Sequence, residues 1–425
     1  MTDTIETLVD EATEARSTGT TTGPRFSTGD GPWLRTEDGT AWFDGTSGSG
    51  ATTLGHQHPR VIAAVTAQLG RLVHTGCKLG SDTRTEMVRR LGALSPYTRP
   101  AVLPTATGAE AVESALKVAR AATGHRAVVA FRYGYHGKTS GALALTWRDG
   151  FRAYSPLPGD TVVTCGLPDP RRSAAGDAEG FAAELSAALD TADRHGGAAA
   201  VILEPVQVTE GVLAVAPAVL DEIARQAHAR GALLILDEIY TGLGRAGRMF
   251  AAETMTERPD LTLIGKTLGN GFPVAAVVGE REVLDALPAG VQTSTFSGNP
   301  LCCAAACAVL DVIVGEDLPG RARALGERMA ADLAELAARH PWMAAVRTAG
   351  ALAAFDCAPD GRPSAELARA VQHAAAEERL LLFGGGPEDA TVKLVPPALL
   401  TDDDYTFFRD ALAAALTTAE RGGRI

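Results

Sequence analysis

The chain has 425 residues, of which 46% are hydrophobic, enough to fill a large core shared by two or three domains. Its formal net charge of -12 argues against nucleic acid and anionic membranes as partners, because both favour basic surfaces. The longest apolar run, Leu301 to Leu310, is shorter than the roughly 20 residues of a membrane helix, and the acidic N-terminus is unlike a signal peptide, so we expect a cytoplasmic protein.

The six cysteines show no CxxC spacing and no paired histidines. This pattern supports neither a zinc site nor a thioredoxin-type redox pair. We therefore expect no metal, and we expect the cysteines to be reduced, packed thiols.

The first 55 residues contain three different segments. Residues 1–24 are polar, with a weakly amphipathic patch at Ile5, Leu8 and Val9 that predicts an arm of undefined structure. Residues 33–44 alternate in polarity around Asp38-Gly39, which predicts a β-hairpin. Residues 45–55 are mostly small, which allows close approach of the backbone to a ligand or a second subunit.

A helix is predicted to begin at Thr107-Gly108-Ala109 and to end at Gly124, because apolar residues recur at helical spacing between them. The free N–H groups and positive dipole end of a helix N-terminus suit a phosphate. The alternative is that Thr107 serves only as an N-cap. A strand follows from Ala127 to Phe131, and residues 133–139 form its loop.

Residues 155–177 are rich in Pro, Gly and Arg and are predicted to form a surface loop. Beyond this loop, helical and apolar strand-like segments alternate. Strands are expected to end at Glu204 and Asp237, and a third is expected from Leu261 to Ile264. This alternation predicts a parallel sheet with helices on both faces. Ligands bind at the carboxyl ends of such strands, so a carboxylate and Lys266 are expected on one rim.

Lysine is rare in this chain: only five of the 39 basic residues are Lys. Where Arg is so strongly preferred, a retained Lys indicates a need for an amine. An amine can lose its proton and form an imine, whereas a guanidinium cannot. Lys266 lies among Gly265, Gly269 and Gly271, where a bound molecule could approach the backbone.

The spacing of Gly242, Gly244 and Gly247 matches the dinucleotide fingerprint GxGxxG. The context does not match. The glycines come too late after the strand that ends at Asp237, and no helix start follows them. A nicotinamide or flavin site is therefore not favoured.

The alternation of strands and helices gives way to a different sequence pattern after Asn299-Pro300. Long amphipathic helices are predicted for residues 319–340 and 365–378, with short strands near 349–355 and 391–395. This combination predicts a separate α+β domain at the C-terminus.

Six motifs occur in an order that resembles the class III aminotransferases, from about Phe26 to the C-terminus. They are TGAEAVESALKVAR, YGYHGKT, LEPVQ, DEIYTGLGRAGRMFA, PDLTLIGKTLGNGFPVAAVVG and TSTFSGNP. The resemblance implies an α/β protein of the fold-type-I class, with a mostly parallel sheet and a smaller α+β domain built from both termini. We expect an arm and ribbon at 1–54, a large domain at 55–305 and a small domain at 306–425.

The resemblance also implies pyridoxal 5'-phosphate (PLP) as cofactor and a homodimer with shared active sites. Lys266 would form a Schiff base with PLP, and Asp237 would pair with the ring nitrogen. The remaining cofactor contacts implied by the family are Thr107, Gly108, Ala109, Tyr135, Glu204, Ile239 and, from the other subunit, Thr295.

The implied reaction is a ping-pong transfer of an amino group from an amino acid, diamino acid or ω-amino acid to a keto acid, either 2-oxoglutarate or pyruvate. The cofactor residues do not distinguish this reaction from racemisation, epimerisation or amino-group migration on the same fold. That alternative stays open on the sequence.

Four expected substrate positions differ from the pattern of the aminotransferases that the chain resembles. In acetylornithine, ornithine and 4-aminobutyrate aminotransferases, two Arg residues bind substrate carboxylates and a Glu screens one of them. Lys138 and Lys393 stand at the Arg positions, Thr209 stands at the Glu position, and Glu210 is displaced by one, so a pair of Thr209 and Lys393 is expected in place of the usual Glu–Arg pair. Lys393 is similar to the lysine of diaminobutyrate aminotransferases, which favours a diamino or ω-amino donor.

Overall fold

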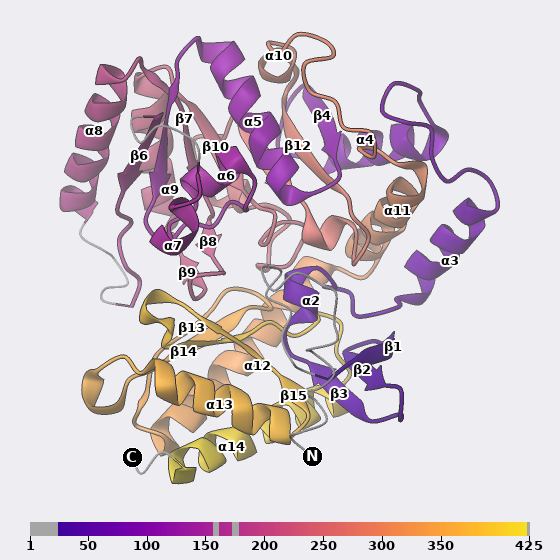
Figure 1. Ribbon diagram of the computed structural model, residues 1–425, viewed down its shortest axis with the longest axis vertical. Helices are drawn as coiled ribbons and strands as arrows, with labels where there is room; N and C mark the ends of the chain where they lie inside the picture. The colour runs from indigo at the N-terminus through magenta and orange to yellow at the C-terminus, as the bar shows by residue number, and fades with distance from the viewer. Residues whose placement is uncertain (1–23, 156–160, 172–177, 423–425) are drawn as a thin grey trace.

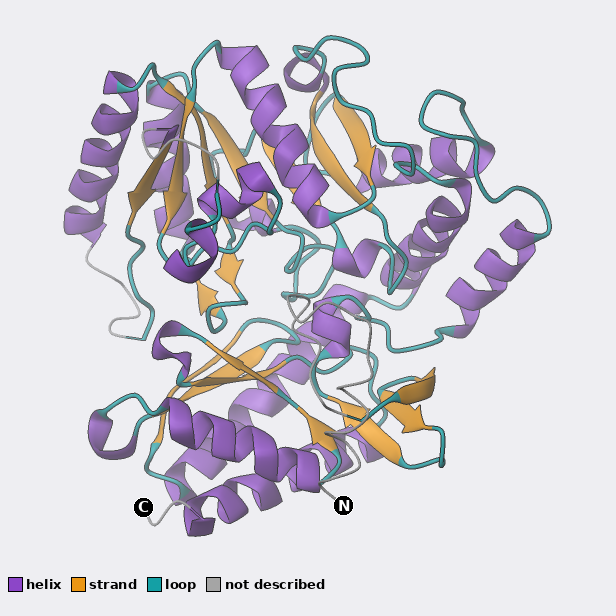
Figure 2. Cartoon of the chain, in the orientation of Figure 1, coloured by secondary structure: helices purple, strands orange, loops and turns teal. Residues whose placement is uncertain are grey.

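The computed structural model describes residues 24–155, 161–171 and 178–422. The amphipathic patch expected at Ile5, Leu8 and Val9 lies outside the described residues. Figures 1 and 2 show two lobes, the larger at the top and the smaller, which holds the C-terminal helices, at the bottom.

A seven-stranded sheet forms the centre of the larger lobe, in the order β4-β12-β11-β10-β7-β5-β6. Only β12 runs against the others, because it is antiparallel to both of its neighbours. The mostly parallel sheet predicted from the sequence is confirmed. The strands are β4 (Pro100–Thr105), β5 (Ala127–Phe131), β6 (Val162–Cys165), β7 (Ala198–Leu203), β10 (Leu233–Asp237), β11 (Leu261–Ile264) and β12 (Ala275–Glu280).

Helices cover both faces of this sheet, since alternate strand residues contribute to two separate apolar clusters. One cluster lies under α5 (Gly108–Thr123), α6 (Ser140–Leu145) and α10 (Arg281–Leu284). The other lies under α3 (Pro59–Leu69), α4 (Asp82–Leu94), α8 (Ala178–Arg194), α9 (Pro217–Ala229) and α11 (Pro300–Gly315). The short helix α7 (Asp149–Arg152) follows α6.

The smaller lobe is built from both ends of the chain. β3 (Ala41–Asp44) pairs with β2 (Trp33–Thr36), as predicted, and also with β15 (Leu380–Leu381). The N-terminal ribbon, which begins with β1 (Phe26–Asp30), therefore shares a sheet with the C-terminal segment. The other elements are α12 (Leu318–Arg339), α13 (Ala365–Glu377), α14 (Asp402–Gly422) and the sheet of β13 (Met343–Thr348), β14 (Ala353–Cys357), β17 (Thr391–Leu394) and β16 (Phe383–Gly385).

Three details differ from the sequence predictions. The expected surface loop at 155–177 contains β6, a four-residue edge strand too short to give a periodic signal. The single strand expected near 349–355 is a hairpin, because Gly350 has a φ of 56° and turns the chain between β13 and β14. The domain boundary expected at residue 305 falls inside α11, which packs on α3 and α4.

Candidate active site

Two neighbouring strands bring a carboxylate and an amine to one rim of the large sheet. β10 and β11 are parallel, with Asp237 opposite Leu263, so both strands end at the same edge. Asp237 is the last residue of β10, and Lys266 follows β11 by two residues. The buried apolar residues of both strands hold this rim in place.

The backbone of Lys266 is strained, with a φ of 39°. A non-glycine residue persists in this conformation only where its surroundings hold it. The small-residue segment supplies such support: the Thr53 and Thr267 hydroxyls lie 2.7 Å apart, and the Asn270 Oδ1 accepts from the Leu54 N–H at 2.9 Å. The segment expected to allow close approach therefore packs against the Lys266 loop.

The Lys266 Nζ lies 3.4 Å from the centroid of the Tyr240 ring. This ring is held from behind by Gly50, where an added Cβ would lie 2.3 Å from the ring. Burial lowers the pKa of Lys266 to about 8, against the opposing charges of Glu204 and Asp237. A buried amine with a lowered pKa is typical of imine-forming lysines.

Asp237 is 2% exposed and hydrogen-bonds to its own loop and to the loop after β5. Its Oδ2 lies 2.7 Å from the His136 Nδ1, and its Oδ1 accepts from the Ile239 N–H at 3.2 Å. The Glu204 Oε1 accepts from the Tyr135 N–H at 2.8 Å. Desolvation, and then the charge of Asp237, raise the pKa of Glu204 well above its usual range.

The N-terminus of α5 lies against the same loops. Thr107 is its N-cap and accepts from the Glu110 N–H at 3.2 Å, so its hydroxyl already has a structural role. A Cβ on Gly108 would lie 2.9 Å from the Ile239 side chain, and a Cβ on Gly265 would lie 3.2 Å from it. Ile239 is thus packed between the helix N-terminus and the residue before Lys266.

These residues fit PLP. Five kinds of group meet at one place: an amine, a buried carboxylate, a helix N-terminus with free N–H groups, the aromatic side chain of Tyr135 and the aliphatic side chain of Ile239. A phosphorylated pyridine aldehyde requires this set of groups. Thr295 is exposed and does not line the pocket of its own chain.

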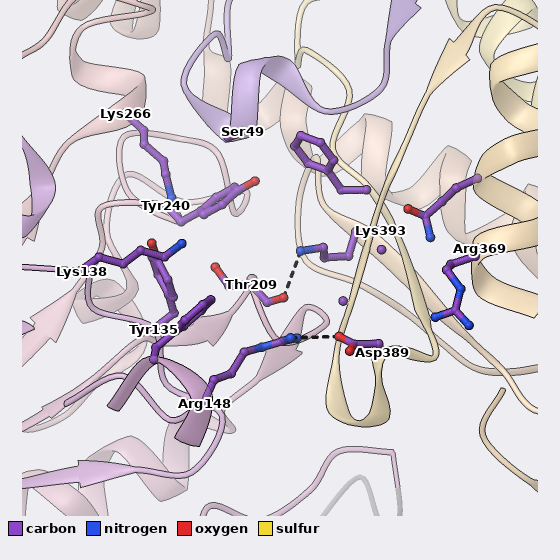
Figure 3. A pocket seen from close by; sticks show the side chains of 15 residues that line it. Ser49, Tyr135, Lys138, Arg148, Thr209, Tyr240, Lys266, Arg369, Asp389 and Lys393 are labelled. Atoms are coloured by element: carbon purple, nitrogen blue, oxygen red, sulfur yellow. Dashed lines mark hydrogen bonds and ion pairs between the residues drawn. The ribbon is translucent and has the colours of Figure 1, made fainter. Parts of the chain in front are cut away.

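A pocket of about 610 Å³ lies beside Lys266, between the two lobes (Figure 3). Its walls are markedly basic. Lys138 lies over the Phe151 ring at 4.3 Å, and the Lys393 Nζ donates to the Thr209 carbonyl at 3.0 Å. Burial lowers the pKa of Lys393 to about 8. The lining residues are Ser49, Tyr135, Lys138, Arg148, Phe151, Thr209, Tyr240, Lys266, Arg369, Gln372, Phe383, Gly384, Gly385, Asp389 and Lys393.

The pocket also holds a Glu-Arg pair that the sequence did not predict. The expected contact between Thr209 and Lys393 is made by the backbone carbonyl of Thr209, whereas Glu210 is paired with Arg148 through two hydrogen bonds. Sequence reasoning missed Arg148, since nothing local connects it with a glutamate 62 residues away. It also missed Tyr240, although this residue lies three positions after Asp237 on the same rim.

The glycine-rich run at 242–247 forms turns and does not open a helix, which leaves it unlike a dinucleotide loop. Among the described residues, no group of His, Cys, Asp and Glu side chains could hold a metal ion. The same residues include no helix of the length and apolarity needed to cross a bilayer.

Comparison with known proteins links this geometry to a family. The family model for aminotransferase class III matches residues 17–416. The chain is 35% identical over 362 residues to the 5-aminovalerate aminotransferase of Pseudomonas aeruginosa, covering 81% of this chain and 83% of that protein. It is 36% identical over 341 residues to the 4-aminobutyrate aminotransferase of Escherichia coli, covering 78% of each.

A solved structure agrees with this match. The ornithine aminotransferase from Toxoplasma gondii, which has PLP at partial occupancy in its active site, superposes with a TM-score of 0.83 at 30% identity. The match covers 94% of this chain and 92% of that structure.

Proposed function

The chain belongs to the class III aminotransferases, which are PLP-dependent enzymes, and we propose that its donor is an ω-amino acid or diamino acid and its acceptor a keto acid. The meeting of Lys266 and Asp237 on one rim of the sheet supports PLP chemistry. The observation that carries the choice of substrates is the basic lining of the pocket beside Lys266, which suits molecules that have a carboxylate. The similarity to a 5-aminovalerate and a 4-aminobutyrate aminotransferase supports the ω-amino donor.

Bound PLP supplies an electron-accepting ring and an aldehyde that holds the amino group. Lys266 would hold this aldehyde, and its Nζ would then carry the proton that is moved on the substrate. A pKa of about 8 leaves part of the amine neutral near physiological pH, so Nζ can accept a proton as well as return it. Asp237 would keep the ring nitrogen protonated, and His136 would hold the Asp237 carboxylate in position.

The substrate carboxylate next to the reacting carbon would bind at Lys393, which lines the pocket and has only the neutral Thr209 carbonyl as its hydrogen-bond partner among the described residues. Lys138, at the pocket mouth, would attract anionic substrates. The Thr209 carbonyl would orient the Lys393 amine for binding of this carboxylate.

We also propose a homodimer in which Thr295 completes the phosphate site of the other subunit. Two loops, 69–79 and 291–296, expose large apolar side chains beside Thr295. The exposed fractions reach 65% at Leu79 and 62% at Phe296. The loops are in contact, because the His74 and Phe296 rings lie 5.1 Å apart. Exposed apolar side chains on two loops that touch favour association with a second copy.

All six cysteines are free thiols, which supports the expected location in the reducing cytoplasm.

A panel of donors tests the reaction. Purified enzyme with PLP receives 5-aminovalerate, 4-aminobutyrate or ornithine together with 2-oxoglutarate or pyruvate, and the formation of glutamate or alanine is measured. Without a keto acid, about one equivalent of donor per active site should be consumed. Lys266→Ala serves as the inactive control. A chiral amino acid that loses its optical purity while no keto acid is consumed would overturn aminotransfer in favour of epimerisation.

A further inference from the structure

Arg148, in the loop between α6 and α7, is bound by two carboxylates that come from different lobes. Its Nε donates to the Glu210 Oε1 at 2.7 Å and its Nη2 donates to the Glu210 Oε2 at 3.2 Å. Its Nη1 lies 2.9 Å from the Asp389 Oδ1 of the smaller lobe (Figure 3). The Nη2 group also donates to the Gly386 carbonyl of the smaller lobe at 3.4 Å. The guanidinium therefore has a two-point contact with Glu210 on one edge, and its contacts with the smaller lobe are the Asp389 carboxylate and this long hydrogen bond.

The two carboxylates are not equivalent. The Glu210 side chain is 3% exposed, whereas that of Asp389 is 59% exposed. The hydrogen bond that Arg148 donates to Glu210 is the main reason that the pKa of Arg148 is raised. Separating a buried pair would leave an uncompensated charge, while an exposed pair contributes little to stability. Only Asp389 can leave Arg148 without a large penalty.

The backbone that carries Asp389 is strained. Glu388 has a φ of 63° and Asp389 a φ of 55°, and both follow Gly386 with a φ of 75°. Two consecutive non-glycine residues in this region cost energy, and such strain is found at ligand clamps and switch segments. Release of Asp389 from Arg148 would allow this segment to relax.

We propose that Arg148 is the binding site for a second substrate carboxylate, which enters by displacing Asp389 from the Nη1 edge of the guanidinium. This inference rests on the proposed function. The ligands are dicarboxylic keto acids such as 2-oxoglutarate, whose second carboxylate lies away from the reacting carbon. Glu210 stays in place throughout and holds the fork of Arg148 in orientation.

The position of Arg148 in the pocket suits this role. Lys393 is bonded to the carbonyl of Thr209, the residue before Glu210, so the two cations lie side by side on the pocket wall. Lys266, Lys393 and Arg148 all line the same pocket, so a substrate bound at Lys266 can present carboxylates to both of the other cations. A substrate with one carboxylate reaches Lys393, and one with two also reaches Arg148.

Exchange of carboxylates at Arg148 explains how one pocket binds both dicarboxylates and monocarboxylates. With a dicarboxylate bound, Arg148 exchanges the Asp389 carboxylate for that of the substrate, so little net charge is buried. With a monocarboxylate bound, Asp389 stays on Arg148 and the guanidinium is not left unpaired.

The test compares 2-oxoglutarate with pyruvate, which lacks the second carboxylate. Arg148→Gln combined with Glu210→Gln keeps a neutral hydrogen-bonded pair and avoids an unpaired buried charge. This double variant should lower the ratio of kcat/KM for 2-oxoglutarate to that for pyruvate about ten- to a hundredfold, the loss of one charge-assisted contact. Asp389→Asn removes the competing charge and should raise the same ratio severalfold. Arg369→Gln, a change to another guanidinium of the pocket, is the matched control and should leave the ratio as in the parent.

A ratio that is unchanged in the double variant, or an equal loss with both acceptors, would overturn the proposal and leave Arg148 with a structural role. A fall of the ratio in Arg369→Gln alone would place the second carboxylate at α13 instead.

A binding measurement separates this inference from the proposed function. Calorimetric titration of the PLP-loaded protein with glutarate, a dicarboxylate, should give weaker binding in the double variant and tighter binding in Asp389→Asn, whichever keto acid is used in turnover. Identical glutarate affinities in all three proteins would overturn the carboxylate site. Failure to aminate either keto acid would count against the proposed function alone.

Discussion

At the scale of single residues, Lys266 carries opposing influences on its charge. Burial disfavours the ammonium, whereas Glu204, Asp237 and the face of Tyr240 favour it. The resulting pKa of about 8 makes the amine usable both as nucleophile and as proton carrier. Tyr240 is the neighbour of Lys266 that no motif indicated, and its contribution can be measured apart from turnover.

Replacement of Tyr240 should change the pKa of Lys266 in the protein freed of PLP. A cation over an aromatic ring gains about 0.5 to 2 kcal/mol, so Tyr240→Leu should lower the pKa by roughly 0.4 to 1.5. Tyr240→Phe keeps the ring and should leave the pKa close to that of the parent. The measurement is acylation of Lys266 at a series of pH values, quantified by mass spectrometry. Equal effects of Phe and Leu would assign the role to the hydroxyl instead of the ring.

Lys393 should control acceptor use. Lys393→Ala should weaken the use of pyruvate and 2-oxoglutarate alike, by about ten- to a hundredfold in kcat/KM, because both carry the carboxylate next to the carbonyl. Lys393→Arg should retain only part of the parent kcat/KM, because the planar guanidinium needs a site shaped for two parallel hydrogen bonds. Impairment of the donor instead of the acceptor would show that Lys393 serves the other half-reaction.

The pH dependence gives a second measure of Lys393. The amine is charged below its pKa of about 8 and neutral above it, with Glu210 favouring the charge and Arg148 opposing it. The KM for keto acids in the parent enzyme should therefore rise above about pH 8. Lys393→Arg keeps its charge and should flatten this rise.

Among the secondary-structure elements, β10 leads into two consecutive acidic residues, at its last position and the next, that have different roles. Asp237 faces the active site, whereas the next residue, Glu238, accepts from the Ala251 N–H through both carboxylate oxygens, at 2.8 and 2.9 Å. Neighbouring residues of an extended chain point to opposite sides, so one strand end can serve both catalysis and packing. Burial raises the pKa of Glu238 to about 8.

The raised pKa of Glu238 predicts a pH-dependent cost to stability. The Glu238 carboxyl binds its proton more tightly in the folded state than in the unfolded state. Its contribution to the free energy of unfolding is therefore fully present below about pH 4.5 and is lost as pH rises through about 8. Glu238→Gln should remove this loss, since one amide oxygen can still accept from Ala251. Thermal unfolding at pH 6 and pH 9 should show a smaller drop in Tm for the variant than for the parent. Equal drops would mean that Glu238 is ionised in the folded protein throughout this range.

At the scale of the whole molecule, the active site depends on surfaces that are far apart in the chain. Lys266 and Asp237 come from the larger lobe, whereas Lys393 and Asp389 come from the smaller one, and the pocket lies between them. Movement of the lobes would change the Arg148–Asp389 contact directly. In the proposed dimer, the apolar loops beside Thr295 would extend the same dependence to a second subunit.

Disruption of the apolar loops should separate the proposed dimer. A variant with Leu79→Glu and Phe296→Glu should elute as a monomer, measured by size-exclusion chromatography with light scattering. It should also lose PLP on dialysis faster than the parent, because Thr295 would no longer reach the other subunit. Tyr154→Glu, at an exposed aromatic outside these loops, is the control and should stay dimeric. A parent protein that is itself monomeric would contradict the proposal.

The sequence by itself determined the family, the cofactor and the fold class of this protein. The reason is physical: apolar runs that stop at Asp237 and before Gly265-Lys266 are strands with chemistry at their carboxyl ends, and the order of such segments restricts the topology. The element bounds followed closely where an apolar run or a helical period was clear, as in β5, β11 and α13. They failed for the edge strand β6, which lies in a segment rich in Pro, Gly and Arg, and at Gly350, where a glycine turn divided one apolar run.

Only the tertiary structure decided which charges meet in the pocket. The sequence led us to expect a pair between Thr209 and Lys393, whereas folding joins Lys393 to a backbone carbonyl and Glu210 to Arg148, with Asp389 on its other edge. These partners lie on separate lobes, and no local pattern records the packing that aligns them. An ion pair depends on distance and burial, both of which are properties of the assembled fold.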